Sequence, residues 1–403
     1  MFKLALRNIF RHKVRTALTL SAIMFGVVAL ILSGGFIEDV FVQLREATIH
    51  SQLGHVQVNR SGYAELGRRD PNAYLISNPT ELSTKLQGLP HVKEVLQRLQ
   101  FSGLVSNGNA ENPIVGEGVE ASKEGRLGTF LEIVEGRNLE DQDVYGVIVG
   151  QGVAGALQLS KGSFITLMTN TLDGSLNSLE FEVVGVFQTF SKEYDDRAIR
   201  ITLDAAQELI ATDQVHTLVF HLEETSFTDS VSESLKQILE TQTFEVLSWL
   251  DIADFYRSTV ALYRRQFAVL QLVILVMVLL GVANSINMAI FERTGEFGTQ
   301  MAVGDPRSRL FRQIMIESTL LGLIGSGLGV LFGAGLASLI SAVGIPMPPP
   351  PNSNVGYTAL IRLVPVVLVT SGLVGFVASI AAAVGPARRS SKLNIVDALR
   401  KNI

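Results

Sequence analysis

Four long apolar stretches are the clearest pattern along this chain. They lie at residues 16–37, 267–291, 306–343 and 363–385, and each is near or above the ~20 apolar residues that a helix needs to cross a bilayer. Residues 51–250 contain no stretch of that kind. The pattern predicts a membrane protein with four transmembrane helices and one large domain inserted between the first two.

The inserted block has the mixed periodicity of an α+β domain. Short runs rich in β-branched and aromatic residues predict strands, namely HVQVN, GVIVG, FITLM, FEVVGVF and HTLVFHL, whereas TELSTKLQGL, LDAAQELIA and SVSESLKQILE predict helices. TLDGSLNS, between two of the strands, is typical of a hairpin tip. Residues 38–50 and 251–266 are amphipathic without a helix breaker, so we expect the first two spans to continue outward as helical stalks.

Charge follows the same division of the chain. Residues 38–265 hold 33 acids and 18 bases, a net charge of −15, and the remainder holds 5 acids and 15 bases, a net of +10. Cytoplasmic loops of membrane proteins carry an excess of Lys and Arg. Because the basic excess lies outside residues 38–265, we expect both termini to be cytoplasmic. The large domain then lies outside the cytoplasm. We expect the membrane to be a bacterial inner membrane, in which that side is the periplasm. The acidic balance argues against nucleic acid as a partner.

The first 15 residues carry Lys3, Arg7, Arg11 and Arg15 at a spacing of four, with apolar residues on another helical face. This pattern predicts an amphipathic helix on the surface of an anionic leaflet. A cleaved signal peptide is the alternative. The apolar run that follows is longer than the ~15 residues of a signal peptide core and no A-x-A site follows it, which favours a retained first span.

The loop between spans two and three predicts a short helix with a defined end. Gly304 is expected to stop this helix, Asp305 to cap the next one and Pro306 to occupy its first position. We expect Glu317 to contact lipid headgroups or Arg312 and Gln313. In order, the expected segments are a surface helix (1–15), span one (16–37), a stalk (38–50), the outer domain (51–250), a stalk (251–266), span two (267–291), the helical loop (292–305), span three (306–343), an outer loop (344–362), span four (363–385) and a cytoplasmic tail (386–403).

Small residues recur every four positions on spans three and four, where they predict close helix packing. They are Gly325, Gly329, Gly333 and Ala337 on one helix and Ser371, Gly375, Ser379 and Ala383 on the other. Whether these contacts lie within one subunit or across a dimer is left open. On span two, Asn284, Ser285 and Asn287 are expected to face protein.

Other candidate chemistry is sparse. Gly150–Gly155 reads GxGxxG, but a dinucleotide site also needs a parallel sheet and a suitably placed acid, so a plain strand–turn–helix is favoured. His50/His55 and His216/His221 are spaced by five, which places neither pair on one helix or strand face and predicts no metal site. No Gly-Lys dipeptide occurs, so there is no Walker A loop. We expect no enzyme activity and no cofactor in this chain, with ATP and Mg²⁺ bound by a partner polypeptide.

Three segments carry a family resemblance: LALRNIFRHKVRTALT, ERTGEFGTQMAVG and GPARRSSKLNIVDALR. Together they resemble permease subunits of the MacB/FtsX/LolC-LolE class of ABC transporters, also called type VII. GVIVGQGVAGALQLSKGSFITL and VLSWLDIADFY resemble the periplasmic core domain of that class. The outer loop IPMPPPPNSNVGY is similar to LolE-like permeases.

The resemblance implies a coupling helix that docks on an ATPase subunit and contains Glu296, Phe297, Gly298, Ala302 and Gly304. Family members often have a basic residue just before the Ala-x-Gly, where this chain has Thr299, Gln300 and Met301. The implied partners are two ATPase copies, a second permease subunit in a homodimer or heterodimer, the lipid bilayer, and a periplasmic or lipoprotein partner. The implied mechanism is mechanotransmission, in which ATP-driven motion passes through the stalks to the outer domain.

Three functions are compatible with this resemblance. The first is extraction or export of a lipoprotein or another amphiphile. The second is efflux of a periplasmic small molecule or peptide. The third belongs to another class: an FtsX-like regulator of a cell-wall hydrolase, which transports nothing.

Overall fold

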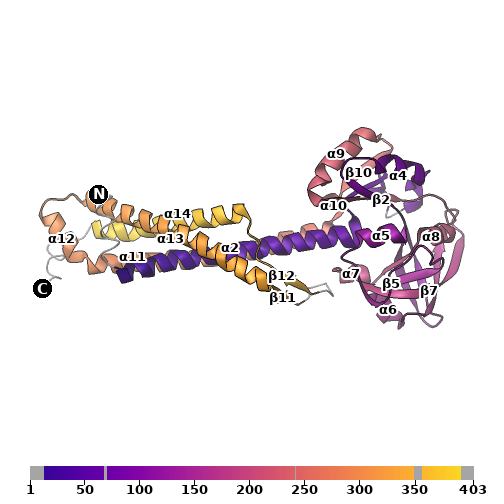
Figure 1. Cartoon of the computed structure of the whole chain (residues 1–403), viewed down its shortest axis with the longest axis horizontal. Helices are drawn as coiled ribbons and strands as arrows, with labels where there is room; N and C mark the ends of the chain where they lie inside the picture. The colour runs from indigo at the N-terminus through magenta and orange to yellow at the C-terminus, as the bar shows by residue number, and fades with distance from the viewer. Residues whose placement is uncertain (1–12, 68–69, 241, 349–355, 392–403) are drawn as a thin grey trace. The chain divides into compact units, whose positions relative to one another are not determined.

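The computed structural model describes residues 13–67, 70–240, 242–348 and 356–391 of the 403 (Figure 1). The chain divides into two compact units. The helical unit comprises the chain up to Val42, Val260–Pro346 and the chain from Thr358 onward. The sheet unit comprises Gln43–Thr259 and Met347–Tyr357.

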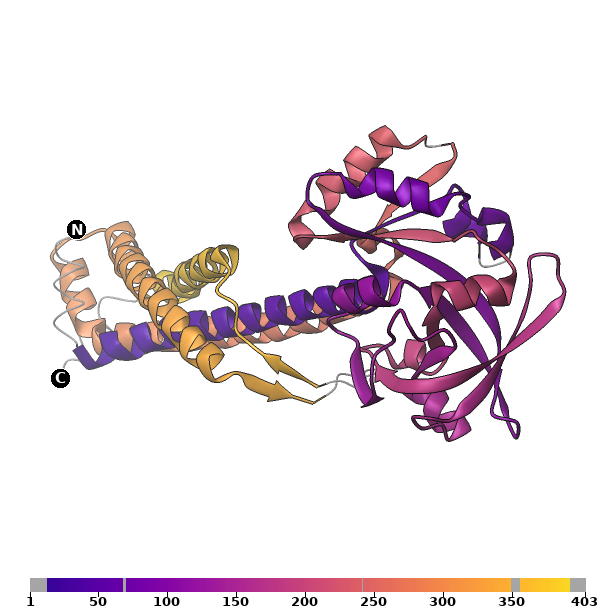
Figure 2. The ribbon, with the colours of Figure 1, turned by 45° about the vertical axis from the view of Figure 1, so that its right-hand side comes forward.

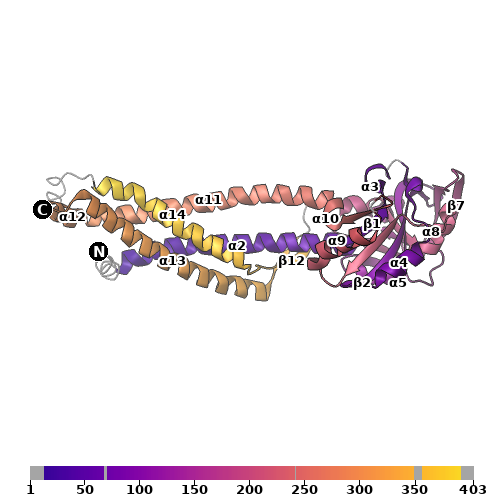
Figure 3. The ribbon, with the colours of Figure 1, turned by 90° about the horizontal axis from the view of Figure 1, so that it is seen from above.

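Four long helices build the helical unit, and Figure 3 shows them along their length. They are α2 (Lys13–Thr48), α11 (Asp254–Glu292), α13 (Arg307–Val343) and α14 (Pro365–Ser391). Each is long and apolar enough to cross a membrane. Helices α2 and α11 have 36 and 39 residues, or roughly 54 and 58 Å at 1.5 Å per residue, against ~30 Å of hydrocarbon. Both therefore extend beyond a bilayer, as expected for stalks.

The small-residue stripe of α13 packs within the same chain. A side chain at Gly325, Gly329 or Gly333 would meet Ile23, Val27 and Ile31 of α2, at 3.0, 2.6 and 2.9 Å respectively. The stripe therefore lets α13 and α2 approach closely.

Helix α14 uses its own stripe in the same way. Gly375 lies against Val27, and Ser379 lies where a side chain at Gly322 of α13 would be. Ser371 and Ser379 are both buried. These residues of the two stripes thus make contacts within the chain.

Helix α14 continues past the predicted end of span four at residue 385. It includes Pro386 and ends at Ser391, so the segment predicted as a tail begins in a helix. Ala383 and Ala387 are fully buried on either side of the proline. Their packing keeps the chain helical despite the missing proline N–H.

The outer loop contains a two-stranded sheet of β11 (Ile345–Met347) and β12 (Tyr357–Ala359). Asp39 of α2 is fully buried. Its carboxylate accepts hydrogen bonds from the Leu360 N–H and from Nε of Arg362, each at 2.8 Å. The chain that follows β12 is therefore held on α2.

Ten strands form the sheet unit: β1 (Val56–Arg60), β2 (Val92–Ser106), β3 (Glu111–Val119), β4 (Glu132–Gly136), β5 (Gly146–Gly150), β6 (Phe164–Asn170), β7 (Leu176–Gln188), β8 (Ala198–Thr202), β9 (Thr217–Leu222) and β10 (Phe244–Ser248). Their order is β10-β1-β9-β2-β3-β8-β5-β7-β4, and β6 pairs with both β2 and β7. Strands β2, β3, β8, β5, β7 and β6 thus close into a ring, in which each strand pairs with a neighbour on both sides.

The helical segments of the sheet unit are the π-helical turn η1 (Ile49–Leu53), the 3₁₀ turns η2 (Pro71–Tyr74) and η3 (Thr225–Phe227), α3 (Tyr63–Leu66), α4 (Pro79–Gln87), α5 (Ala121–Leu127), α6 (Gln151–Leu157), α7 (Lys192–Asp195), α8 (Leu203–Ile210), α9 (Thr228–Ile238) and α10 (Trp249–Ile252). Figure 2 shows α4 and α9 in the lobe formed by β10, β1, β9 and β2. Leu86 of α4 and Leu235 of α9 are buried there against Val95 and Phe220.

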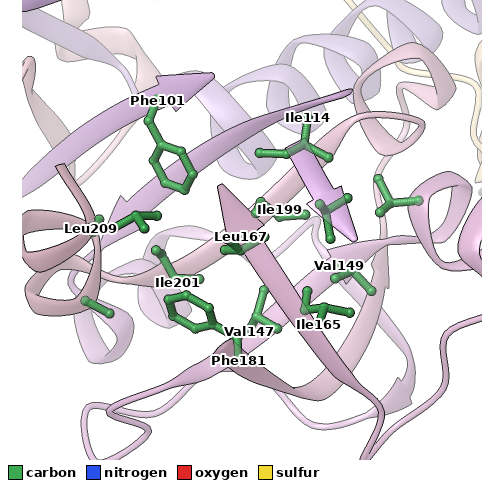
Figure 4. Packing of buried hydrophobic residues seen from close by; sticks show 14 of the residues in the cluster. Phe101, Ile114, Val147, Val149, Ile165, Leu167, Phe181, Ile199, Ile201 and Leu209 are labelled. Carbon is green, nitrogen blue, oxygen red and sulfur yellow. The ribbon is translucent and has the colours of Figure 1, made fainter. Parts of the chain in front are cut away.

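Apolar side chains from all six strands fill the ring (Figure 4). Phe101, Ile114, Val147, Leu167, Phe181 and Ile199 contribute one from each strand. Gly116 of β3 leaves room for the Phe101 ring, and Gly118 leaves room for Ala206 of α8. The interior is therefore a packed core.

The predicted strands and helices match β1, β5, β6, β7, β9, α4, α8 and α9, and the predicted hairpin tip joins β6 to β7. The α+β fold class between the first two spans is confirmed. The sequence analysis did not name β2, β3, β4, β8 or β10. Strand β2 belongs both to the ring and to the lobe of β10, β1 and β9. Its alternation is hidden because Gln97 and Arg98 are polar yet buried where the lobes meet.

Candidate functional site

Helix α12 (Thr294–Ala302) contains most of the predicted coupling residues, and it follows α11 with Arg293 at its N-cap. At the other end, the N–H of Gly304 donates to Met301 O and that of Asp305 to Gln300 O, each at 3.1 Å. Gly304 has φ +105°, a conformation that favours glycine. This pair of bonds is a Schellman motif, so Gly304 ends α12 as predicted.

The predicted cap of α13 is wrong by one residue. Pro306 occupies the N-cap position with extended backbone, and the helix begins at Arg307. The carboxylate of Asp305 instead accepts a hydrogen bond from Nη1 of Arg309 at 2.6 Å. Asp305 therefore lies one residue too early to cap the helix.

One face of α12 is anchored in the helical unit. Phe297 is 1% exposed and Met301 is 7% exposed. Both belong to an apolar cluster with Ile286 of α11 and with Leu310 and Ile314 of α13. Phe297 and Gly298 are buried, so these two predicted coupling residues hold α12 in place rather than form its outer surface.

An ion pair adds a second anchor to α12. Arg293 is 5% exposed, and its Nη1 lies 3.0 Å from Oε2 of Glu317 on α13. Its Nε donates to Oε2 of Glu296 at 3.1 Å, and its guanidinium lies 5.0 Å from the centre of the Phe297 ring. A buried arginine with both an acid and an aromatic partner fixes geometry more tightly than an exposed pair does.

The structure pairs Glu317 with Arg293, whereas the sequence analysis expected lipid headgroups or Arg312 and Gln313. The side chain of Glu317 is 14% exposed. It lines a cavity of about 40 Å³ whose walls include Thr19, Ser318 and Phe297. The reversal of the chain between α11 and α13 brings Arg293 back to Glu317, and this proximity has no local signature.

The opposite face of α12 is open. Glu296, Thr299 and Ala302 are exposed, as are Val303 and Gly304 at its end. Val303 is 85% exposed, and the sequence analysis did not single it out. An exposed apolar residue at the end of a doubly anchored helix is a suitable contact for another protein.

The predicted membrane-surface residues Lys3, Arg7 and Arg11 lie outside the described residues, as does the side chain of Arg15. Most of the C-terminal tail and residues 349–355 of the LolE-like outer loop also lie outside them.

A groove of about 450 Å³ runs along the helical unit between α2, α11 and α14. Its walls are mainly apolar, and they include Leu30, Leu275 and Val374. Glu38 and Gln271 add polar groups. Such a groove has the size of a small-molecule site and presents both apolar and polar surface.

Asn284 and Asn287 are exposed on α11. Among the residues that the structure describes, α11's neighbours therefore do not cover these two amides. Amides exposed to lipid are costly, so another protein surface is a better environment for them.

The GxGxxG segment forms strand β5 and helix α6, as the plain reading predicted. A side chain at Gly150 would meet the backbone of Asp195, and one at Gly152 would lie 2.5 Å from the Cα of Asp196. The last residue of α7 and the residue after it therefore fill the space beside these glycines. They serve packing here.

Three histidines that the spacing separated are brought together by the fold. The ring centres of His50, His55 and His221 lie 5.2–5.8 Å apart. Burial and the neighbouring histidines lower the pKa of His55 to about 3, and burial, Lys93 and His50 lower that of His221 to about 4. Even so, within the described part of the chain no set of three His, Cys, Asp or Glu side chains has metal-binding geometry.

Comparison with known proteins places the chain in a family. A model of the MacB-like periplasmic core domain matches residues 16–238, and a model of the FtsX-like permease C-terminal region matches residues 268–395. The first model alone covers more than half of the chain.

Several relatives span much of the chain. An ABC transporter permease of Methanocaldococcus jannaschii is 26% identical over 67% of this chain and 65% of its own length. The macrolide export ATP-binding/permease protein MacB of Bdellovibrio bacteriovorus is 24% identical over 96% of this chain and 60% of its own length. This chain thus spans less than two thirds of those two relatives. The ABC transporter permease YknZ of Bacillus subtilis is 23% identical over 99% of this chain and 98% of its own length.

A crystal structure of the periplasmic region of MacB from Actinobacillus actinomycetemcomitans aligns with 52% of this chain and 93% of its own. The identity is 15% and the TM-score is 0.37. The two family models together cover residues 16–238 and 268–395. The chain therefore belongs to the MacB/FtsX-like, type VII family of ABC transporter permeases.

Proposed function

We propose that this permease couples ATP hydrolysis by a separate ATPase subunit to movements of the sheet unit on the periplasmic side. The observation that carries the proposal is α12, whose inner face is anchored through Phe297 and the Arg293–Glu317 pair. Its outer face presents Glu296, Thr299 and Val303. A helix held this firmly transmits a push from a bound partner to α11 and α13.

Helices α2 and α11 are the proposed path to the sheet unit. Each is continuous through the boundary between the units, at Val42/Gln43 in α2 and at Thr259/Val260 in α11. A continuous helix is stiffer than a loop, so motion at one end reaches the other. The +10 net charge outside residues 38–265 supports the α12 end and both termini as cytoplasmic.

The assembly we infer has two permease subunits and two ATPase copies, which bind ATP and Mg²⁺. Asn284 and Asn287 support a second permease subunit against α11, because this chain leaves both exposed. Contacts between polar side chains stabilise helix pairs within membranes.

The proposed cargo is a lipoprotein or another amphiphile drawn from the outer leaflet. The groove between α2, α11 and α14 supports this class, because it joins apolar walls to Glu38 and Gln271. An acyl chain fits the apolar part, and a polar headgroup fits the rest. Efflux of a small molecule is the second candidate, favoured by the relatives that are named macrolide exporters.

A photo-cross-linking amino acid at position 303 tests the partner. Val303 is 85% exposed, so in native membranes we expect the cross-linker at this position to form an adduct with an ABC ATPase subunit. The same group at Met301, which is 7% exposed, is the matched control and should form none. An adduct with a hydrolase from the sheet unit, and no ATPase adduct from position 303, would favour the regulator instead.

Cargo and coupling are tested in nanodiscs with the captured ATPase. We expect a lipoprotein to stimulate ATP hydrolysis more than a macrolide does. Leu44→Pro, which breaks α2 beyond the membrane, should abolish transport while assembly persists, and Leu44→Ala is its control. Unchanged transport by Leu44→Pro would exclude α2 as the path.

A further inference from the structure

Two buried arginines meet where α2 ends in the sheet unit. Arg98 on β2 is 2% exposed and Arg200 on β8 is 1% exposed. Arg98 makes a two-pronged ion pair with Glu124 of α5, and Arg200 Nε donates to Oε2 of Glu117 on β3 at 3.0 Å. Arg200 Nη1 also lies 3.4 Å from Glu124. We call these four residues the arginine clamp.

The remaining donors of the clamp reach the turn η1, which ends α2. Arg200 Nη2 donates to Ser51 O at 3.0 Å, and Arg98 Nη1 donates to Gln52 O. Carbonyl groups in the last turn of a helix lack partners within the helix. Two positive side chains beside these carbonyl groups are also stabilised by the negative end of the helix dipole.

The clamp is electrically balanced, with two arginines and two glutamates. Burial alone would raise the pKa of Glu124, but Arg98 and Arg200 hold it below its ordinary value, so the carboxylate stays charged. Burial raises the pKa of Tyr194, whose hydroxyl donates to Glu117 at 3.1 Å. Every charge in the clamp therefore has an opposite partner at hydrogen-bonding distance.

Stability alone is a weak reason for such a site. Removing four charged groups from water is costly, and well-packed apolar residues of similar volume are often as stable. What the clamp adds is direction, because the planar fork of an arginine fixes both partners in angle and distance. The contacts fix the end of α2 on β2 and β8, two strands on either side of β3.

The same turn is packed from its other side. Ile49 of η1 is fully buried in a small cluster with Trp249 of α10 and Ala253, just before α11 begins. The ends of both stalks therefore meet in one place. Trp249 is the only tryptophan of the chain and reports on this place without a label.

We propose that Arg98 and Arg200 are positioning residues that hold the end of α2 on the sheet, so that movement of α2 moves the sheet unit. The proposal rests on the proposed function, since it needs α2 to carry ATP-driven motion. It adds the joint at which that motion enters the sheet: two arginine side chains on the carbonyl groups of Ser51 and Gln52.

The test uses the full chain with its ATPase in nanodiscs and measures amide hydrogen exchange. Arg200→Lys keeps the positive charge but loses the guanidinium N–H that donates to Ser51 O. Arg98→Lys is a second variant, which loses the donor to Gln52 O. We expect exchange across residues 49–54 to rise about tenfold, the effect of one lost charge-assisted hydrogen bond. We also expect the ATP-dependent change in exchange at β2 and β8 to disappear while ATP hydrolysis continues.

The control is Arg126→Lys. Arg126 lies on α5 beside the clamp, but it pairs with Glu94 at the surface and is 54% exposed. It should leave both measurements unchanged. The thermal midpoint verifies that each variant is folded, and a variant that unfolds is replaced by the lysine variant of the other arginine.

Two results would overturn the clamp. Unchanged exchange at 49–54 in both lysine variants means that the arginines do not hold the turn. Raised exchange there with the ATP-dependent change intact means that they are structural only. Failure of the proposed function looks different, because the unaltered chain itself would then show no ATP-dependent change at β2 and β8, and the clamp's role would fall with it.

Discussion

The guanidinium of Arg293 lies 3.0 Å from the carboxylate of Glu317, joining the start of α12 to the third long helix across 24 positions of sequence. Both side chains are largely buried, and Phe297 covers the arginine. The orientation of α12, and thus of its exposed face, depends on this pair.

Glu317→Ala should therefore destabilise α12. Removing Glu317 takes away the buried partner of Arg293 and leaves its guanidinium paired with the more exposed Glu296, which costs about 1–3 kcal/mol. We expect a lower thermal midpoint in detergent and several-fold less ATPase subunit co-purifying with the chain. The control is Asp305→Ala, because the Arg309–Asp305 pair is exposed and such pairs contribute about 0–1 kcal/mol. Equal loss of ATPase binding in both variants would contradict this role for Glu317.

Two glycines on α13 offer a matched pair for the helix packing. A methyl group at Gly329 would lie 2.6 Å from Cβ of Val27, whereas one at Gly335 would meet nothing within 4 Å. We expect Gly329→Ala to cost about 1–3 kcal/mol through overpacking and Gly335→Ala to be neutral or slightly stabilising. Thermal unfolding in detergent measures the difference, and similar midpoints would show that α13 and α2 are not closely packed.

A similar pair tests the GxGxxG segment. Gly152 packs on Asp196, whereas Gly155 has nothing within 4 Å. Gly152→Ala should lower the thermal midpoint of the chain, and Gly155→Ala should not. Neither variant should alter nucleotide binding by this chain, which isothermal calorimetry with NAD and ATP can check. If the unaltered chain bound NAD or ATP with micromolar affinity and only Gly152→Ala lost this binding, the GxGxxG segment would be a nucleotide site.

The histidine cluster predicts a dependence of stability on pH. His55 and His221 have pKa values lowered to about 3 and about 4 in the folded chain, against the ordinary value of 6.5 for histidine. Below pH 6.5 the unfolded chain therefore binds more protons, so folding stability falls as the pH drops from about 6.5 toward 4.

Unfolding followed by Trp249 emission at pH 7 and pH 5.5 measures this slope. His55→Asn and His221→Asn should each flatten it. His91→Asn is the control, since His91 is exposed on the surface beside Glu223. A slope that is the same in all three variants would assign the pH dependence to other groups.

The membrane architecture was predictable because its signals are local. A span needs only a continuous apolar run, and a helix end such as Gly304 needs only a residue that accepts a positive φ. Strands β1, β5, β6, β7 and β9 were visible for the same reason. Strand β2 was not, because its buried positions include Gln97 and Arg98, which break the apolar pattern.

The candidate site was only half predictable. The position of α12 in the loop follows from the sequence, but the division of its residues into an anchored and an open face does not. Phe297 looked like a docking residue and is buried, whereas Val303 escaped notice and is exposed. Which face is covered depends on α11 and α13, and these contacts join residues far apart in the chain.

The sequence by itself determined that this chain has four spans, where its large domain lies in their order, and that it contains no Gly-Lys dipeptide. Hydropathy, charge and motifs are local properties of the chain. Only the tertiary structure decided that Arg293 meets Glu317, that Arg98 and Arg200 reach the carbonyl groups of η1, and that β2 to β8 close into a ring. Long-range pairs of this kind depend on how the chain returns on itself. Each partner alone is an ordinary polar residue, so no local pattern reveals the pair.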